Sequence, residues 1–388
     1  MPAVRMLIAQ TSDPDDTGNA VREILAQLDL SRNQMRHSMG LVHCHNAFVE
    51  SGALKAVCAR LPFPVLGYNT YLHSSSLGAI ENMLMTATVL TSDTVKFSAG
   101  LSSPIHDDVR GPTAAMYVET ENLLRGRPAM GIIFPPKLTG LATGEILTEA
   151  LDEVSDGVPF FGGQPADYTT YLRDPKVFFN GEDYHDRAAM VLIEGDVRPR
   201  FHVFPVSAEK RIRQKAIITA SERNVVKEVN GMPVLDFMES LGLCFEGKMA
   251  GTTTIPLFLD RWDGSPPTVR SILAQTPEGW LILSGRAPID STLGIGAMDE
   301  THILEGVRRV TSLARLSRPE VFVLYSCLSR NVSLGFNYKS EAEAVRLGLD
   351  GNAPYLFAYT SGEICPVMLK DGKWHNEYHN MSLVTFSF

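Results

Sequence analysis

The stretch VFVLYSCLSRNVSLGF, residues 321–336, is the most informative part of this chain of 388 residues. It begins with a strongly apolar run, typical of a buried strand, and changes at Ser326 to small and reactive polar residues. A second stretch, YLFAYTSGEICP at 355–366, repeats this plan and turns polar near Ser361. In open α/β sheets, ligand sites commonly lie where rigid strands carry polar tips into a crevice. The two stretches therefore predict a site at the ends of two strands.

The N-terminal half of the sequence alternates between helical and strand-like patterns. Val21, Ile24, Leu25 and Leu28 follow one another with helical spacing after an acidic helix start at 13–17. Further helices are predicted at 47–61, 113–124 and 143–154. Strands are predicted at 39–45, 64–67, 82–92, 95–102 and 131–135. Helix and strand in alternation favour a sheet that is covered by helices.

From about residue 157 onward, strand-like runs dominate the sequence. Strands are predicted near 175–180, 188–195, 200–206, 214–220, 253–259, 268–275 and 279–284. Helices are predicted near 233–241, 299–316 and 340–348. We expect a mixed α/β (α+β) fold in two sheet-containing halves with flanking helices, with one domain at 1–206 and a second at 207–388.

The amino-acid composition narrows the functional class. Lys and Arg number 35 against 44 Asp and Glu, which gives a formal net charge of -9. A nucleic-acid-binding protein needs a basic face toward the phosphates, so this balance argues against nucleic acid as a partner. Apolar residues make up 44% and charged residues 20% of the chain, as in ordinary globular proteins, so disorder is not expected.

Cysteine usage favours a reducing compartment, and the hydropathy pattern predicts neither a signal peptide nor a membrane helix. Five cysteines in 388 residues are few and odd in number, which disfavours a disulfide scaffold. The apolar run near the N-terminus, 6–9, is too short for the core of a signal peptide. No window approaches the roughly 18 apolar residues of a membrane helix. We therefore expect a cytoplasmic protein without membrane insertion.

Sequence motifs for common cofactors and metals are missing. There is no P-loop pattern, no G-x-S-x-G nucleophile elbow and no H-E-x-x-H zinc motif. Gly294 and Gly296 lack the third glycine of a dinucleotide-binding fingerprint, and we interpret them as an ordinary turn. His43 and His45 point to one face of a strand but make only half a zinc site. No cofactor and no metal is predicted.

Cys327 is the strongest candidate for a catalytic nucleophile. It follows a buried strand and stands three residues before Arg330, whose guanidinium would favour a thiolate. With His379 as a base and Glu363 as an orienting group, it supplies the residue types of a nucleophile triad, so a hydrolase or transferase is one alternative. The other alternative is a buried, inert cysteine, and the sequence leaves both open.

Several short motifs, taken in order, resemble the FIST-domain family with its N-terminal and C-terminal regions. They are Gly67-Tyr-Asn-Thr70, Phe161-Gly-Gly163, Ala166-Asp167, Val177-Phe-Phe-Asn-Gly181, Val229-Asn-Gly231 with Pro233, Leu241-Gly242, Ser326-Cys-Leu-Ser-Arg330, Ser361-Gly-Glu-Ile364 and His379-Asn380. The resemblance spans roughly residues 40–388 and rests on the order and spacing of the motifs.

The resemblance implies a sensory role. FIST regions are regarded as intracellular sensory modules of signal-transduction proteins, and small ligands such as amino acids have been inferred for them. The two regions use up nearly the whole chain, so no attached kinase or cyclase is expected. The resemblance therefore implies a small-molecule ligand, an amino acid among the candidates, and signalling through a separate partner protein.

An amino-acid ligand needs both of its charges satisfied. Arg330 is the candidate for the carboxylate, and Glu363 or Asp167 for the ammonium group. Tyr359 and Asn380 would orient the ligand, and glycines would let backbone N–H groups approach it. The full set of predicted ligand-binding residues is Asn69, Thr70, Gly162, Gly163, Asp167, Cys327, Arg330, Tyr359, Gly362, Glu363, His379 and Asn380.

Each of these residues also has a purely structural interpretation, which the sequence leaves open. Arg330 and Glu363 would then form an ion pair with each other. The glycines would serve turns, and Asp167 would cap one. His379 and Asn380 would hold a hairpin in place, and Asn69 and Thr70 would cap a loop.

Overall fold

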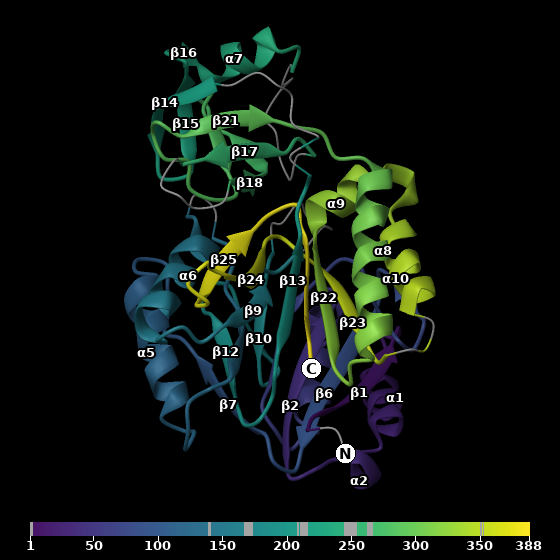
Figure 1. Ribbon diagram of the computed structural model, residues 1–388. Helices are drawn as coiled ribbons and strands as arrows, with labels where there is room; N and C mark the ends of the chain where they lie inside the picture. Colours follow the sequence, from purple (N-terminus) through teal and green to yellow (C-terminus); the bar gives the residue numbers. More distant parts are fainter. Residues whose placement is uncertain are drawn as a thin grey trace.

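Three six-stranded sheets form the body of the protein, and an eight-stranded sheet forms a separate β-rich unit beside them (Figure 1). The structure is a computed structural model, which describes residues 3–138, 141–166, 174–207, 209, 216–243, 254–261, 267–349, 351 and 353–388. Helices flank the sheets of the body. The mixed α/β fold expected from the sequence is thereby confirmed.

The first sheet has the strand order β1-β6-β2-β3-β10-β11. Its strands, in this order, are β1 (Arg5–Thr11), β6 (Met85–Ser92), β2 (His37–Cys44), β3 (Val65–Asn69), β10 (Val177–Phe179) and β11 (Glu182–Tyr184). The helices that connect its strands are α1 (Thr17–Leu28), α2 (Leu30–Asn33), α3 (Ala47–Glu50) and α4 (Ala53–Cys58). The single helix expected at 47–61 is interrupted near Gly52, whose φ of 79° is left-handed.

The second sheet has the order β7-β12-β8-β9-β24-β25. Its strands, in this order, are β7 (Lys96–Leu101), β12 (Ala189–Glu194), β8 (Met130–Phe134), β9 (Phe160–Gly163), β24 (Glu363–Met368) and β25 (Trp374–His379). Its connecting helices are α5 (Arg110–Glu121) and α6 (Thr143–Val154).

The third sheet has the order β13-β26-β22-β23-β4-β5. Its strands, in this order, are β13 (Arg200–Phe204), β26 (Leu383–Ser387), β22 (Phe322–Cys327), β23 (Leu356–Thr360), β4 (His73–Ser75) and β5 (Ile80–Glu81). Its helices are α8 (Glu300–Ser317), α9 (Leu328–Ser333) and α10 (Ser340–Leu349), with a 3₁₀ turn at Gly335–Asn337.

These three sheets share one plan. In each, the third and fourth strands are parallel, and every other neighbouring pair is antiparallel. A hairpin that follows each parallel pair crosses to a neighbouring sheet: β4–β5 joins the third sheet, β10–β11 the first and β24–β25 the second. The exchange is cyclic, so each sheet is completed by strands from another part of the chain.

The inner faces of the three sheets meet in one apolar core. Met39 and Tyr68 reach it from the first sheet, Phe161 from the second, and Tyr325 and Phe386 from the third. The outer faces pack against helices, namely α1, α3 and α4 on the first sheet, α5 and α6 on the second, and α8 and α10 on the third. The body is therefore a three-sided arrangement with sheets inside and helices outside (Figure 1).

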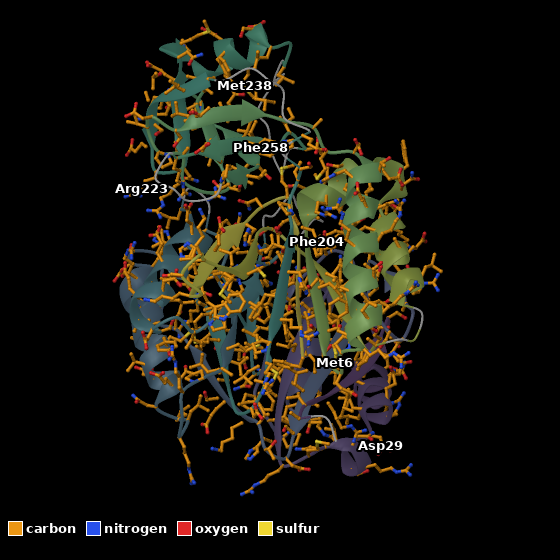
Figure 2. All side chains as sticks on the ribbon, viewed as in Figure 1. Met6, Asp29, Phe204, Arg223, Met238 and Phe258 are labelled. Carbon is orange, nitrogen blue, oxygen red and sulfur yellow. The ribbon has the colours of Figure 1, made fainter. Side chains whose placement is uncertain are left out.

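The β-rich unit lies between β13 and α8 in the sequence. Its elements are β14 (Ala216–Glu222), β15 (Val225–Val229), β16 (Met232–Pro233), α7 (Val234–Ser240), β17 (Leu257–Asp260), β18 (Thr268–Arg270), β19 (Ile272–Gln275), β20 (Leu281–Leu283) and β21 (Thr292–Ile295). It has its own apolar core, which includes Met238, whereas Phe258 packs with Met381 of the body (Figure 2).

Glu145, in the first turn of α6, anchors the β-rich unit to the body. Its carboxylate accepts hydrogen bonds from the Arg261 guanidinium and the Arg286 N–H, both at 2.6 Å, and lies 3.3 Å from the guanidinium of Arg270. Glu145 and Arg270 are buried, so the charges are taken out of water together. The ion cluster fixes the unit next to α6.

The domain boundary expected between residues 206 and 207 remains a prediction. The described sheets do not divide there, because β13 precedes it while β26, β22 and β23 of the same sheet follow it. Within the described residues, no helix combines the length and apolar character that spanning a bilayer requires.

Candidate functional site

The carboxyl ends of the parallel strands β3, β9 and β23 meet at one place, which we call the junction. It consists of Thr70, Lys137, Gln164, Cys327 and the segment 360–363. One parallel pair from each sheet contributes, since Thr70 follows β3, Lys137 and Gln164 follow β8 and β9, and Cys327 ends β22. The carboxyl ends of parallel strands are where ligands bind in many α/β proteins.

Backbone and side-chain hydrogen bonds tie the strand ends together at the junction. The Thr70 hydroxyl donates to the carbonyl of Tyr359 at 2.9 Å. The N–H of Gln164 donates to the carbonyl of Gly362 at 2.9 Å, and the N–H of Ser361 donates to the carbonyl of Gln164 at 3.1 Å. The three sheets are therefore joined here by direct bonds rather than by packing alone.

Glycines allow this close approach. A Cβ on Gly162 would collide with the carbonyl oxygen of Ile133 on β8, and one on Gly163 would press on the side chain of Thr360. A Cβ on Gly362 would collide with the Tyr378 hydroxyl. Each of these positions needs a residue without a side chain for the strands to sit where they do.

Glu363 is a fully buried carboxyl group at the start of β24. One oxygen accepts from the Thr360 hydroxyl at 2.7 Å, and the other from the Ser382 hydroxyl at 2.8 Å. Burial raises the pKa of Glu363 to about 7, although these hydrogen bonds and one from Cys327 act in the opposite direction. The group is therefore poised between its charged and neutral forms near neutral pH.

Cys327 is buried beside Glu363, with 2% of its surface exposed. Burial, and next the charge of Glu363, raises the pKa of the Cys327 thiol to about 12. A thiol with so high a pKa is almost entirely protonated at neutral pH and is a poor nucleophile.

Lys137 supplies the positive group of the junction. Its amino group lies 3.5 Å from the side-chain oxygen of Gln164 and 3.5 Å from the carbonyl oxygen of Ser361, and both contacts are long for hydrogen bonds. Burial lowers the pKa of Lys137 to about 8, although the charges of Cys327 and Glu363 act to raise it. The junction thus holds an amine and a carboxyl group, each with a pKa near neutrality.

Gln164 and Tyr378 are hydrogen-bonded to one another at the junction. The Tyr378 hydroxyl donates to the side-chain oxygen of Gln164 at 2.6 Å, and the Gln164 amide N–H donates to the carbonyl of Pro136 at 2.8 Å. The hydroxyl of Ser361 is buried and has no hydrogen-bond partner. It is a donor and acceptor that a bound molecule can use.

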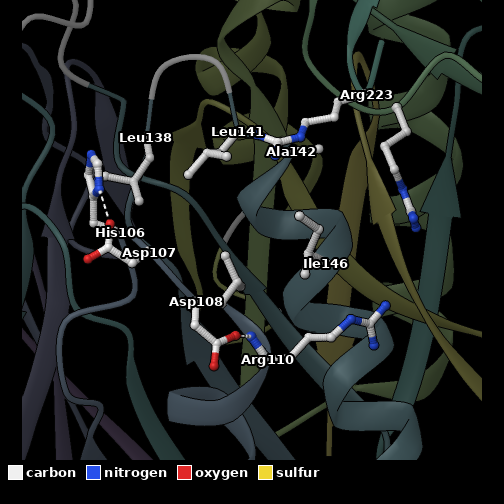
Figure 3. Close-up of a pocket in the computed structure, with 11 residues that line it drawn as sticks. His106, Asp107, Asp108, Arg110, Leu138, Leu141, Ala142, Ile146 and Arg223 are labelled. Carbon is white, nitrogen blue, oxygen red and sulfur yellow. Dashed lines mark hydrogen bonds and ion pairs between the residues drawn. The ribbon is translucent and has the colours of Figure 1, made fainter.

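A cavity of about 910 Å³ is lined by Leu138, the residue that follows Lys137 in the sequence. Leu138 lies on one wall with Leu141, and Arg223 of the β-rich unit lies on the opposite wall (Figure 3). Arg110, on α5, also lines it but is held by Glu149 and Glu153. The junction residues do not line this cavity.

Comparison with protein families matches the FIST N domain to residues 38–232 and the FIST C domain to residues 236–366. The chain belongs to the FIST family. The resemblance seen in the sequence is confirmed, and FIST domains are recognised as sensory domains. A comparison with curated proteins gave no match.

Both FIST domains contribute to the junction. Of the predicted ligand-binding residues, the structure brings together Thr70, Gly162 and Gly163 from the FIST N domain and Cys327, Gly362 and Glu363 from the FIST C domain. Their roles in binding remain predictions.

Arg330 and Tyr359 lie on the opposite face of the third sheet. The Arg330 guanidinium donates to Oε1 of Glu341 on α10 at 2.7 Å, and the Tyr359 hydroxyl donates to Oε2 of the same carboxylate at 2.9 Å. All three residues are buried in the FIST C domain. Arg330 therefore pairs with Glu341 rather than with Glu363, the partner considered from the sequence.

Asn69, His379 and Asn380 contact other elements. The amide of Asn69 bonds to the backbone of Asp174 and Lys176, which leads into β10. Nε2 of His379 donates to the carbonyl of Cys365 at 2.9 Å, so this nitrogen does not serve Cys327. Asn380 accepts a hydrogen bond from Ser284 of the β-rich unit at 2.8 Å. Asp167 lies outside the described residues.

Lys137, Gln164 and Tyr378 are the residues that sequence reasoning missed. The signal for Lys137 is the segment Phe134-Pro-Pro-Lys137, in which a lysine stands directly after a buried strand. Gln164 follows the glycines of β9 in the same way. A search for polar residues after every predicted strand would have found Lys137, whereas Gln164 follows β9, a strand that was not predicted from the sequence.

Proposed function

We propose that this FIST protein is a sensory protein that binds a small metabolite at the junction, with an amino acid as the best match. The proposal includes signalling through a separate protein in the cytoplasm. It is supported by the family and by the residue types that the two FIST domains contribute to one site.

The observation that carries the proposal is the presence of Lys137 and Glu363 at the same junction. They are opposite in charge type and act on one another electrostatically, yet the structure describes no salt bridge between them. An α-amino acid has a carboxylate for Lys137 and an ammonium group for Glu363. Bound in this way, it would hold both groups in their charged forms and offset the cost of burying them.

Uncharged groups around the pair are suited to the rest of such a ligand. The free hydroxyl of Ser361 and the carbonyl oxygens at the strand ends accept hydrogen bonds from an ammonium group. Because the strand ends of all three sheets meet here, a bound ligand would contact elements that hold the whole body together. Such a position suits a sensor, whose ligand must favour one arrangement of the protein over another.

A thermal-shift screen of the purified protein against the twenty amino acids tests the proposal. A ligand present at a hundredfold its Kd adds roughly 2.7 kcal/mol of stability. Lys137→Met should abolish the shift, whereas the matched control Lys96→Met, which removes a lysine from a surface pair with Glu194, should retain it. No shift with any amino acid would refute the amino-acid ligand, and a shift that persists in Lys137→Met would refute binding at Lys137.

A further inference from the structure

Among the described lysines that are partly buried, Lys137 differs in the groups that surround its amino nitrogen. A carboxylate lies within 4.0 Å of the amino group in each of Lys96, Lys176, Lys227 and Lys339. For Lys137 the structure describes two uncharged oxygens, both 3.5 Å away. An amine without a counter-ion, in a half-buried site, is held less firmly in its protonated and unreactive form.

Glu363 is the acidic residue of the junction that acts electrostatically on that amine. The Lys137 amino group contacts the carbonyl of Ser361, and Glu363 follows two residues later, at the start of β24. The carboxyl group is oriented by Thr360 and Ser382, and its pKa of about 7 lets it both take up and release a proton. A lysine whose amine has its pKa lowered by burial is the type of lysine that forms Schiff bases.

We propose that Lys137 captures small aldehydes and ketones as a reversible imine, with Glu363 as the proton carrier. The inference rests on the proposed function, since it assigns a second ligand class to the same site. It makes the site a carbonyl receptor, in which the ligand is held by a covalent bond that water can reverse.

The chemistry balances without a co-reactant. The lone pair of the Lys137 nitrogen attacks the carbonyl carbon, the carbonyl π pair moves to oxygen, and one proton passes from nitrogen to oxygen through Glu363. The hydroxyl of the resulting carbinolamine takes a proton from Glu363 and leaves as water while the nitrogen lone pair forms the C=N bond. The iminium nitrogen then returns its proton to Glu363, which leaves the neutral imine. The net reaction converts one carbonyl compound and one amine into one imine and one water.

The test is reductive trapping with pyruvate and cyanoborohydride on the full chain at pH 7.5, with each lysine followed by peptide mass spectrometry. We expect Lys137 to be modified at least tenfold faster than Lys96, which is also partly buried but paired with Glu194 at 2.7 Å. The rate at Lys137 should have its midpoint near pH 8, where its amine becomes neutral. Glu363→Gln, which keeps the shape of the side chain, should lower the Lys137 rate without changing the Lys96 rate.

The outcomes separate this inference from the proposed function. Modification of Lys137 no faster than Lys96 overturns the imine, and the amino-acid proposal stands if amino acids still stabilise the protein. Fast trapping at Lys137 without amino-acid stabilisation supports the imine and refutes the amino-acid ligand. If neither is seen, both fall.

Discussion

The guanidinium of Arg330 lies 2.7 Å from the carboxylate of Glu341, and both side chains are buried between the third sheet and α10. Arg330 also donates to the hydroxyl of Ser326 and to the carbonyl of Ile303. The pair thus connects β22, α8 and α10, and its contacts explain a structural role without a ligand.

Arg330→Met should lower the free energy of unfolding by about 3–5 kcal/mol, because it leaves the Glu341 carboxylate buried without its partner. Replacing both residues, as Arg330→Met with Glu341→Leu, should recover much of the loss. Urea unfolding of the three proteins measures this. A single variant as stable as the wild type would show that the pair is not needed for the fold.

Glu363 should make the protein less stable as pH rises through its titration range. Between pH 4.5 and about 7 the folded protein keeps a proton on Glu363 that the unfolded chain has lost, so this part of the stability is present below pH 4.5 and is gone above about 7. The loss is at most roughly 3 kcal/mol.

Glu363→Gln removes this titration, and the variant should gain on the wild type as pH rises from 5 to 8. Thermal unfolding at several pH values gives the difference. Parallel curves for the two proteins would mean that the pKa of Glu363 is not raised in the folded state.

Gly162→Ala should cost about 3 kcal/mol or more, because the added methyl group would meet the backbone of Ile133, which cannot rotate away. Gly306→Ala is the matched control. There the new Cβ would have ordinary contacts of 3.6 Å and 3.7 Å, and within α8 alanine favours the helix by up to about 1 kcal/mol. Equal effects in chemical unfolding would contradict the close approach of β8 and β9.

Cys327 should react slowly with iodoacetamide at pH 7.5, because burial keeps its thiol protonated and covered. The same cysteine in urea-unfolded protein is the reference, and a rate at least a hundredfold lower is expected in the folded protein. Peptide mass spectrometry resolves the sites. A folded-state rate above the reference would revive the enzyme alternative with Cys327 as nucleophile.

Local patterns in the sequence predicted much of the fold. The helix expected at 143–154 has these bounds in α6, because apolar spacing is a local signal. The common plan of the three sheets has no such signal. It depends on hairpins that pair with strands far away in sequence, as when Glu363 pairs with Gly163.

Only part of the candidate site could be predicted, because local patterns reveal the ends of strands but not the contacts between distant segments. Strand tips with polar residues were recognised at Cys327 and Glu363, and the structure brings them together. The direction of Arg330 was not predictable, because its side chain leaves α9 toward Glu341 on α10 rather than toward the end of the strand before it. Its partner Glu341 is eleven residues away, on another helix.

The most direct test of the junction as the ligand site is isothermal titration with the amino acid that stabilises the protein most. Lys137→Met and Glu363→Gln should each weaken binding at least tenfold, since each removes a charge partner. Tyr359→Phe should leave the affinity unchanged, because its hydroxyl bonds to Glu341 on the opposite face of the sheet. Loss of binding in Tyr359→Phe, with both junction variants unaffected, would contradict the account and move the site to the face of Arg330.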